Sequence, residues 1–341
     1  MSEPLLTVAC GDYDRVAPLR DGRVRPEGVQ LNMVRLEPEE SFWRMARHEE
    51  FDVAEMSLAS YFMMRAGGDH RFVAIPVFLA RSFRHASIYV REGSKIQEPA
   101  DLNGRSIGVP EYQMTAAVWA RGLLSDDFGV DLSSIEWVTC SADTTASAAR
   151  QRLHLPDHIH TRALGSYAEL MKAFASGELE ALIAPRVPAT YQLDGQGAIR
   201  RLFPDHHAKA RDYYLRTRIF PIMHLMVVRA NRHSQFPWLA QSIYKAFAEA
   251  KRLTLAGVVA EPTPRYTMPF LPAAIEEQVS VFGEDPWPYG LLANAGALET
   301  FGRYLVEQGL IETIPTVNDL FAESTEIQSE DGHYPALWSI D

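Results

Sequence analysis

Two arginines and a histidine lie together in the segment Arg81-Ser82-Phe83-Arg84-His85, just before a predicted strand. The planar guanidinium of arginine suits carboxylates, and histidine transfers protons near neutral pH. In an extended backbone Arg81 and His85 would point to one side and Arg84 to the other. The segment therefore indicates a site that binds a carboxylate and moves a proton. The simpler interpretation is an exposed basic loop between strands.

A second histidine, His224, lies in the otherwise apolar run 220–228. A lone histidine in such a strand is commonly a core residue. His224 is therefore either a core residue or a functional one. His85 and His224 could be proton donor and base, or two ligands of a divalent metal with Glu55 or Asp14 as the carboxylate partner. Because the two histidines are far apart in sequence, their spacing does not favour a metal. We expect no cofactor, with a divalent metal as the alternative.

The residues Asp12-Tyr13-Asp14-Arg15 follow the first predicted strand. Open α/β sheets place their ligands at the carboxyl ends of the strands. Tyr13, Asp14 and Arg15 are therefore candidate site residues. In the alternative interpretation Asp12 caps a helix and the charges after it face solvent.

Three more candidates stand at the ends of predicted elements. Glu55 ends a strand, where it could act as a base or support an arginine. Thr115 lies in 110–116, which joins a strand to a helix, so its hydroxyl could meet an anion at a helix N-terminus or simply cap the helix. Arg186 follows the strand 179–184 and would face the same cleft as a further basic clamp.

The segment Asp285-Pro286-Trp287-Pro288-Tyr289-Gly290 is aromatic and too irregular for a core helix. Trp287 and Tyr289 could cover a bound ligand, or the segment could pack against the body of the protein. The usual nucleotide, serine-hydrolase and zinc-protease motifs are not present in the sequence.

These residues must be positioned by an α/β fold, because short apolar runs alternate with amphipathic helical stretches. The predicted strands are 5–10, 29–36, 51–56, 72–77, 86–90, 105–109, 135–139, 179–184 and 222–228. The predicted helices are 41–50, 57–64, 114–124, 167–174 and 238–253. A break at 91–104 separates one half of the pattern from the next.

Composition limits the classes of function. The chain has 341 residues, 47% of them hydrophobic, which is enough for two ordinary cores. A net charge of -11 argues against a nucleic-acid partner. The two cysteines, Cys10 and Cys140, cannot form a disulfide framework. No apolar window approaches the roughly 20 residues that a membrane helix needs, so we expect no membrane partner.

The order of these elements resembles the type 2 periplasmic-binding-protein fold. The words PADLNGRSIGV at 99–109 and FASGELEAL at 174–182 are similar to the segments that lead into and out of the second lobe in that superfamily. The resemblance implies a first lobe formed by 1–92 and 220–341, including a C-terminal extension. Residues 93–219 would form the second lobe, with a ligand cleft between the lobes.

A narrower set of words resembles the 4,5-dihydroxyphthalate decarboxylase family over most of the chain. The words are ACGDYDR at 9–15, FDVAEMS at 51–57, FLARSFRH at 78–85, GVPEYQMTA at 108–116, FPIMH at 220–224 and DPWPYG at 285–290. This resemblance implies a cytoplasmic carboxy-lyase that removes one carboxylate from a dihydroxylated phthalate to give protocatechuate.

Such a reaction needs a proton at the ring carbon that carries the leaving carboxylate, and a hydroxyl para to it that supplies electron density. It also needs a basic clamp for the carboxylates. The expected catalytic residues are His85, His224, Glu55 and Asp14. The expected substrate contacts are Arg81, Arg84, Arg186, Tyr13, Arg15, Thr115, Trp287 and Tyr289.

Two other functions suit the same fold. One is a solute-binding protein that captures an anionic small molecule for a transporter. The other is a different enzyme on this scaffold, such as one acting on a chorismate-like or pyrimidine precursor. Binding proteins are normally exported, whereas no export signal is recognisable before the first predicted strand. We therefore expect a cytoplasmic enzyme that acts on a small aromatic dicarboxylate. The enzyme could be a monomer or a homo-oligomer.

Overall fold

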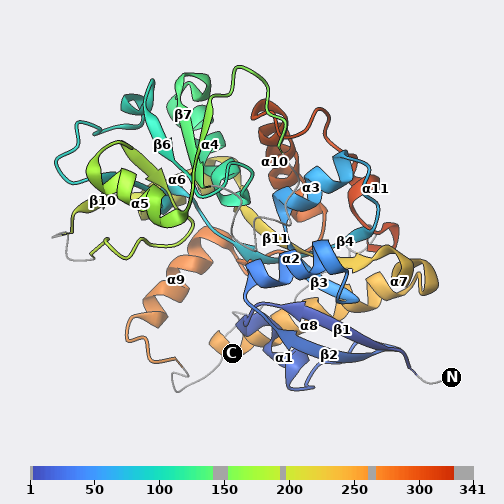
Figure 1. The fold of residues 1–341 in the computed structure, drawn as a ribbon. Helices are drawn as coiled ribbons and strands as arrows, with labels where there is room; N and C mark the ends of the chain where they lie inside the picture. Colours follow the sequence, from blue (N-terminus) through green and yellow to red (C-terminus); the bar gives the residue numbers. More distant parts are fainter. Residues whose placement is uncertain (1–2, 141–152, 193–196, 260–265, 326–341) are drawn as a thin grey trace.

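The computed structural model describes residues 3–140, 153–192, 197–259 and 266–325, and contains two β-sheets with helices packed around them (Figure 1). The strands are β1 (Leu5–Cys10), β2 (Gln30–Arg35), β3 (Val53–Ser57), β4 (Phe72–Arg81), β5 (Ile88–Arg91), β6 (Ser106–Gly108), β7 (Glu136–Cys140), β8 (Thr161–Leu164), β9 (Ala181–Ile183), β10 (Ile199–Arg201) and β11 (Ile222–Arg229). The helices are α1 (Ala17–Arg20), α2 (Pro38–His48), α3 (Leu58–Ala66), α4 (Thr115–Phe128), α5 (Tyr167–Ser176), α6 (His206–Thr217), α7 (Ala230–Gln235), α8 (Leu239–Val259), α9 (Leu271–Phe282), α10 (Ala295–Glu307) and α11 (Val317–Leu320). The prediction of an α/β fold is confirmed.

The first sheet has the strand order β2-β1-β3-β11-β4. Strands β1, β2 and β3 are parallel, so their carboxyl ends meet at one edge. Strand β11 runs antiparallel between β3 and β4, and every residue of β3 is buried. A polar side chain in either strand therefore needs a partner inside the protein.

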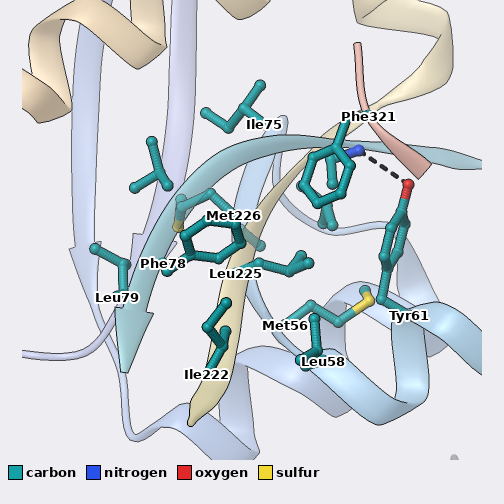
Figure 2. Packing of buried hydrophobic residues seen from close by; sticks show 14 of the residues in the cluster. Met56, Leu58, Tyr61, Ile75, Phe78, Leu79, Ile222, Leu225, Met226 and Phe321 are labelled. Carbon is teal, nitrogen blue, oxygen red and sulfur yellow. Dashed lines mark hydrogen bonds between the residues drawn. The ribbon is translucent and has the colours of Figure 1, made fainter. Parts of the chain in front are cut away.

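Apolar side chains from these strands form the core of the first lobe (Figure 2). The buried residues drawn there include Met56, Leu58, Ile75, Phe78, Leu79, Ile222, Leu225, Met226 and Phe321. At the edge of this cluster the hydroxyl of Tyr61 accepts a hydrogen bond from the Ala74 N–H at 3.0 Å and donates one to the Leu320 carbonyl. The C-terminal part of the chain is thereby joined to the first sheet.

The second sheet has the order β10-β5-β9-β6-β7-β8. Strand β5 is hydrogen-bonded to β9 and β10, so it belongs to this sheet. The chain thus passes from the first sheet to the second between Arg81 and Ile88, which is earlier than the lobe boundary at residue 92 that we expected. Sequence pattern alone assigns β5 as a strand but does not give its partners. The chain returns between Arg201 and Ile222.

The C-terminal extension packs against both lobes. Helix α10 lies beside α4, and the Tyr304 hydroxyl donates to the Asp126 carboxylate at 2.7 Å (Figure 1). A Cβ atom at Gly122 would lie 2.2 Å from the Tyr304 ring, so only glycine permits this approach of the two helices. None of the helices in the described part of the chain is long and apolar enough to cross a membrane.

Candidate active site

The centre of the candidate site is the side chain of Glu55, which is fully buried on β3. Its carboxylate accepts three hydrogen bonds: from the Gly11 N–H at 2.8 Å, from the Tyr13 hydroxyl at 2.7 Å and from His224 Nδ1 at 2.7 Å. Gly11 and Tyr13 follow β1, and His224 lies on β11. Because β1 and β11 flank β3 in the sheet, the fold itself brings these groups together.

The surroundings keep Glu55 charged. Burial alone would raise its pKa, but the hydrogen bond and charge of His224, with the donors Gly11 and Tyr13, bring the pKa below its ordinary value. For Tyr13 the shift is opposite: burial, together with the charge of Glu55, raises the pKa of its hydroxyl. Tyr13 therefore remains a proton-carrying donor to an ionised carboxylate.

His224 reaches the surface, with 21% of its side chain exposed. A carboxylate only accepts hydrogen bonds, so Nδ1 carries the proton that Glu55 receives. The opposite nitrogen, Nε2, has no hydrogen-bond partner among the described residues. The ring of Phe42 packs edge-on against the imidazole at 4.8 Å. His224 is thus held in one orientation, with Nε2 available to a ligand.

Gly11 makes this arrangement sterically possible. A Cβ atom at this position would lie 2.7 Å from the ring of Tyr13. Any other residue would push the Tyr13 hydroxyl away from Glu55. Sequence reasoning did not single out Gly11, Phe42 or Ser57, although a glycine directly after a strand is a recognisable signal of close approach.

A positive charge lies next to this group. The Arg15 guanidinium is sandwiched between the rings of Tyr13 and Trp287, 4.3 Å from each ring centroid. It pairs with Asp14 at 3.2 Å and also donates to the Leu79 carbonyl. The Trp287 indole is fixed by a 2.8 Å hydrogen bond to the Phe78 carbonyl. Arg15 is therefore a rigid, mostly buried cation beside Tyr13.

Tyr289 lies close to the same cation. It is buried, and the positive charges of Arg15 and Arg81 act on its hydroxyl, although burial is the larger influence and raises its pKa. Its hydroxyl has no hydrogen-bond partner among the described residues. Lys251 Nζ lies 4.8 Å from the centre of its ring.

Arg81 is occupied by other parts of the protein. Its guanidinium donates to the Phe220 carbonyl at 2.9 Å, to the Pro288 carbonyl at 2.6 Å and to the Asn294 side chain. Burial lowers the pKa of Arg81 to about 9. The side chain thus joins the end of β4 to the segment that returns to the first sheet and to the C-terminal extension.

Thr115 brings the second lobe into contact with the first. Its hydroxyl lies 2.9 Å from the Ser57 hydroxyl and accepts a hydrogen bond from the Ala59 N–H at 3.0 Å. Ser57 is the register partner of His224 across the β3–β11 pair. The start of α4 therefore meets the start of α3 next to the candidate site.

Arg186 also spans the two lobes, but on the surface. Its side chain is 72% exposed and pairs with Glu39 at 3.0 Å and Glu37 at 3.7 Å, at the start of α2. In this arrangement its charge is directed to acidic side chains of the first lobe.

Arg84 and His85 lie elsewhere. His85 is buried, with its ring 5.8 Å from Phe203 and 5.7 Å from Tyr213, and burial lowers its pKa to about 4. No contact within the described ranges joins it to Glu55 or His224. Within these same ranges, no group of three or more histidine, cysteine, aspartate or glutamate side chains could hold a metal ion.

Comparison with known proteins gives three results. No family model matches the chain. A 4,5-dihydroxyphthalate decarboxylase of Comamonas testosteroni is 36% identical over 301 residues, covering 88% of this chain and 91% of the relative. A 4,5-dihydroxyphthalate decarboxylase of Pseudomonas putida is 39% identical over 214 residues, covering 63% of this chain and 83% of the relative.

Among solved structures, the periplasmic aliphatic sulphonate binding protein SsuA of Escherichia coli aligns with a TM-score of 0.53 at 14% identity, covering 94% of this chain and 98% of its own. A periplasmic sulfonate-binding protein SsuA of Methylobacillus flagellatus aligns with a TM-score of 0.55 at 12% identity, covering 94% and 92%. At such low identity the likeness concerns the fold alone. It confirms the two-lobed periplasmic-binding-protein-like architecture.

Proposed function

Because this chain belongs to the 4,5-dihydroxyphthalate decarboxylase family, we propose that it converts 4,5-dihydroxyphthalate to protocatechuate and carbon dioxide. The observation that carries this proposal is the buried Glu55–His224 pair beside the Arg15 guanidinium. A proton donor and a receptor for a carboxylate are the two groups that the reaction requires, and both border Tyr13. The enzyme is a carboxy-lyase that acts without an oxidant.

The reaction begins with the substrate hydroxyl that is para to the leaving carboxylate. As this hydroxyl gives its proton to water, electron density moves to the ring carbon that carries the carboxylate. The Nε2–H of protonated His224 gives its proton to that carbon and a C–H bond forms. The bond between the ring and the carboxylate then breaks, carbon dioxide leaves and its bonding electrons restore the aromatic ring. The phenolate and His224 are reprotonated, so each turnover consumes one proton.

Glu55 supports the proton transfer in two ways. Its fixed negative charge lies against the His224 ring, and its hydrogen bond to Nδ1 aims Nε2 at the substrate. The hydrogen bonds from Gly11 and Tyr13 keep the carboxylate itself in place. Asp14, which pairs with Arg15, limits the freedom of that guanidinium.

Arg15 is the best-placed receptor for the carboxylate that the substrate retains. Its flat guanidinium is held between two rings, so little side-chain freedom is lost when an anion binds. Trp287 lies against it and would contact the substrate ring. The roles of Arg84, Arg186, Thr115, Tyr289 and His85 in substrate binding or proton transfer remain predictions.

The test is to incubate the purified, chelator-treated protein with 4,5-dihydroxyphthalate and to follow carbon dioxide and protocatechuate together. We expect the two products in equal amounts. If the treated protein is inactive and a divalent metal restores turnover, the metal alternative is correct. Binding of the substrate without turnover under both conditions would contradict the proposal and favour a solute-binding protein.

A cytoplasmic location and the subunit number also remain predictions. We propose that the enzyme acts in the cytoplasm, as the family resemblance implies. Cell fractionation tests the location, since recovery in the periplasmic fraction would contradict it. Light scattering on the purified protein gives the number of subunits.

A further inference from the structure

Lys251 of α8 is a buried charged residue that the proposed reaction does not use. Its side chain is only 1% exposed. The ammonium group donates a hydrogen bond to the Asp285 carboxylate and another, at 2.9 Å, to the Trp287 carbonyl. Asp285 in turn accepts a hydrogen bond from the Trp287 N–H at 2.9 Å. Both polar groups of the Trp287 backbone are therefore held by this one ion pair.

The ion pair thereby fixes the residue that lies against Arg15. The Arg15 guanidinium lies between Trp287 and Tyr13, 4.3 Å from each ring centroid, so its orientation depends on where the indole lies. Helix α8 also supports the other side of this arrangement. The Thr254 hydroxyl, three residues after Lys251, lies 3.1 Å from the carbonyl of the residue that precedes Arg15. One helix therefore positions both Trp287 and the backbone that carries Arg15.

Stability alone does not account for an ion pair at this position. Taking a lysine and an aspartate out of water costs free energy that their attraction repays only in part, and neutral residues of similar size often serve stability as well. The Lys251–Asp285 pair differs from apolar packing in one respect, because it makes directional hydrogen bonds to the backbone of Trp287. The contribution that apolar residues could not make is therefore the placement of Trp287.

We propose that Lys251 is a positioning residue for substrate binding, which holds Trp287 against Arg15 and so keeps the guanidinium in place for the carboxylate that the substrate retains. This inference rests on the proposed function in one respect, the role of Arg15 as the carboxylate receptor. Lys251 acts through Trp287 and not through the Glu55–His224 pair. Its loss should therefore weaken carboxylate binding without slowing the proton transfer.

Calorimetric binding of phthalate tests the proposal without turnover, because phthalate has both carboxylates but lacks the hydroxyl that the reaction needs. We expect Lys251→Met to raise the Kd for phthalate about fivefold. In an Arg15→Met background, which already lacks the receptor, the same substitution should change the Kd by less than about twofold. Lys245→Met, at an exposed position of the same helix, is the matched control and should leave the Kd unchanged.

Steady-state kinetics with 4,5-dihydroxyphthalate provides the second readout. We expect Lys251→Met to raise the KM about fivefold while kcat stays within about twofold of wild type, a division that a smaller folded fraction does not produce. If Lys251→Met does not fold, the double variant Lys251→Met/Asp285→Asn removes both charges and leaves neither one unpaired. It should show the same increases in Kd and KM.

Three results would overturn the proposal: an unchanged Kd, an equal increase in Kd in the wild-type and Arg15→Met backgrounds, or a lower kcat at an unchanged KM. A wild-type protein that does not bind phthalate would also overturn it, whether or not this protein decarboxylates the substrate. If the expected pattern of Kd values is found in a protein without turnover, the role of Lys251 stands and only the proposed reaction is wrong.

Discussion

Glu55 retains a negative charge in the interior because three donors converge on its carboxylate. Each donor comes from a different point in the chain: the backbone of Gly11, the hydroxyl of Tyr13 and the imidazole of His224. An ionised side chain without these partners would be too costly to bury. The hydrogen bond between Glu55 and His224 therefore has two effects. It stabilises the buried carboxylate, and it orients the imidazole for the proposed proton transfer.

Glu55→Gln tests whether the charge of Glu55 supports the chemistry of His224. Glutamine keeps the size of the side chain but removes the negative charge next to the His224 ring. We expect kcat to fall about 100-fold, within the range for general acid catalysis, while the Kd for the substrate changes little. Steady-state kinetics and calorimetric binding measure the two quantities. Glu307→Gln, which removes an exposed partner of Arg303, serves as the control. Equal kcat values in wild type and Glu55→Gln would contradict this role.

His85 predicts a pH dependence of stability. Because its folded-state pKa is lowered from 6.5 to about 4, the unfolded chain binds more protons than the folded protein between these values. The contribution of neutral His85 to the free energy of unfolding is therefore fully present above pH 6.5. It falls as the pH decreases toward 4, by about 3 kcal/mol in total.

We expect His85→Gln to reduce the loss of unfolding free energy over this pH range, as measured by urea denaturation at several pH values. His48→Gln, at an exposed position, should leave the pH dependence unchanged. Parallel curves for wild type and His85→Gln would show that His85 is not a buried neutral group.

At the scale of elements, the two lobes meet at contacts from the starts of helices. The start of α4 reaches the first lobe through Thr115 and Ser57, and Arg186 reaches Glu39 at the start of α2. The second contact is exposed, so it contributes only a fraction of a kcal/mol. Because the family resemblance implies a ligand cleft between the lobes, loss of this contact would weaken the arrangement in which the lobes meet around a ligand.

Reversing the charges of the Arg186–Glu39 pair tests this contact. We expect Arg186→Glu to raise the KM for 4,5-dihydroxyphthalate about threefold, because a pair worth about 0.5 kcal/mol is replaced by repulsion. Glu39→Arg in the same chain should restore the KM. Arg23→Glu, which disturbs an ion pair with Asp21 inside the first lobe, is the control. If the second substitution fails to restore the KM, Arg186 acts on the substrate directly, as the sequence predicts.

The elements that form the core of the first lobe could be predicted from the sequence, because burial imposes regular apolar patterns on β1, β3, β11 and α8. Strand β10 has three residues, and α6, rich in histidine, lysine and arginine, has few buried positions, so neither gives such a pattern. The strand ends indicated Tyr13 and Glu55 as candidate site residues, and in the structure the two side chains are hydrogen-bonded. Their contact with His224, 169 residues from Glu55, depends on the pairing of β11 with β3, which no local pattern specifies.

For the whole molecule, Arg81 joins parts of the chain that are far apart in sequence. The sequence predicts a carboxylate clamp at this position, and in the structure three protein oxygens surround the guanidinium. We expect Arg81→Met to lower the free energy of unfolding by about 3 kcal/mol, because one buried and two part-buried acceptors lose their donor. The KM of the folded fraction should change little. Denaturant unfolding checks the stability, and Arg15→Met should show the opposite behaviour, a raised KM with a smaller loss of stability.

The proposed role of His224 as proton donor is tested by the rate of decarboxylation by His224→Gln at saturating 4,5-dihydroxyphthalate. Glutamine can still bond to Glu55 but cannot deliver a proton. We predict that kcat falls by a factor of about 100 to 10,000 while the substrate Kd stays within a few-fold of wild type, as loss of a general acid requires. The exposed variant His48→Gln is measured in parallel. A kcat for His224→Gln close to that of wild type would show that His224 is not the proton donor.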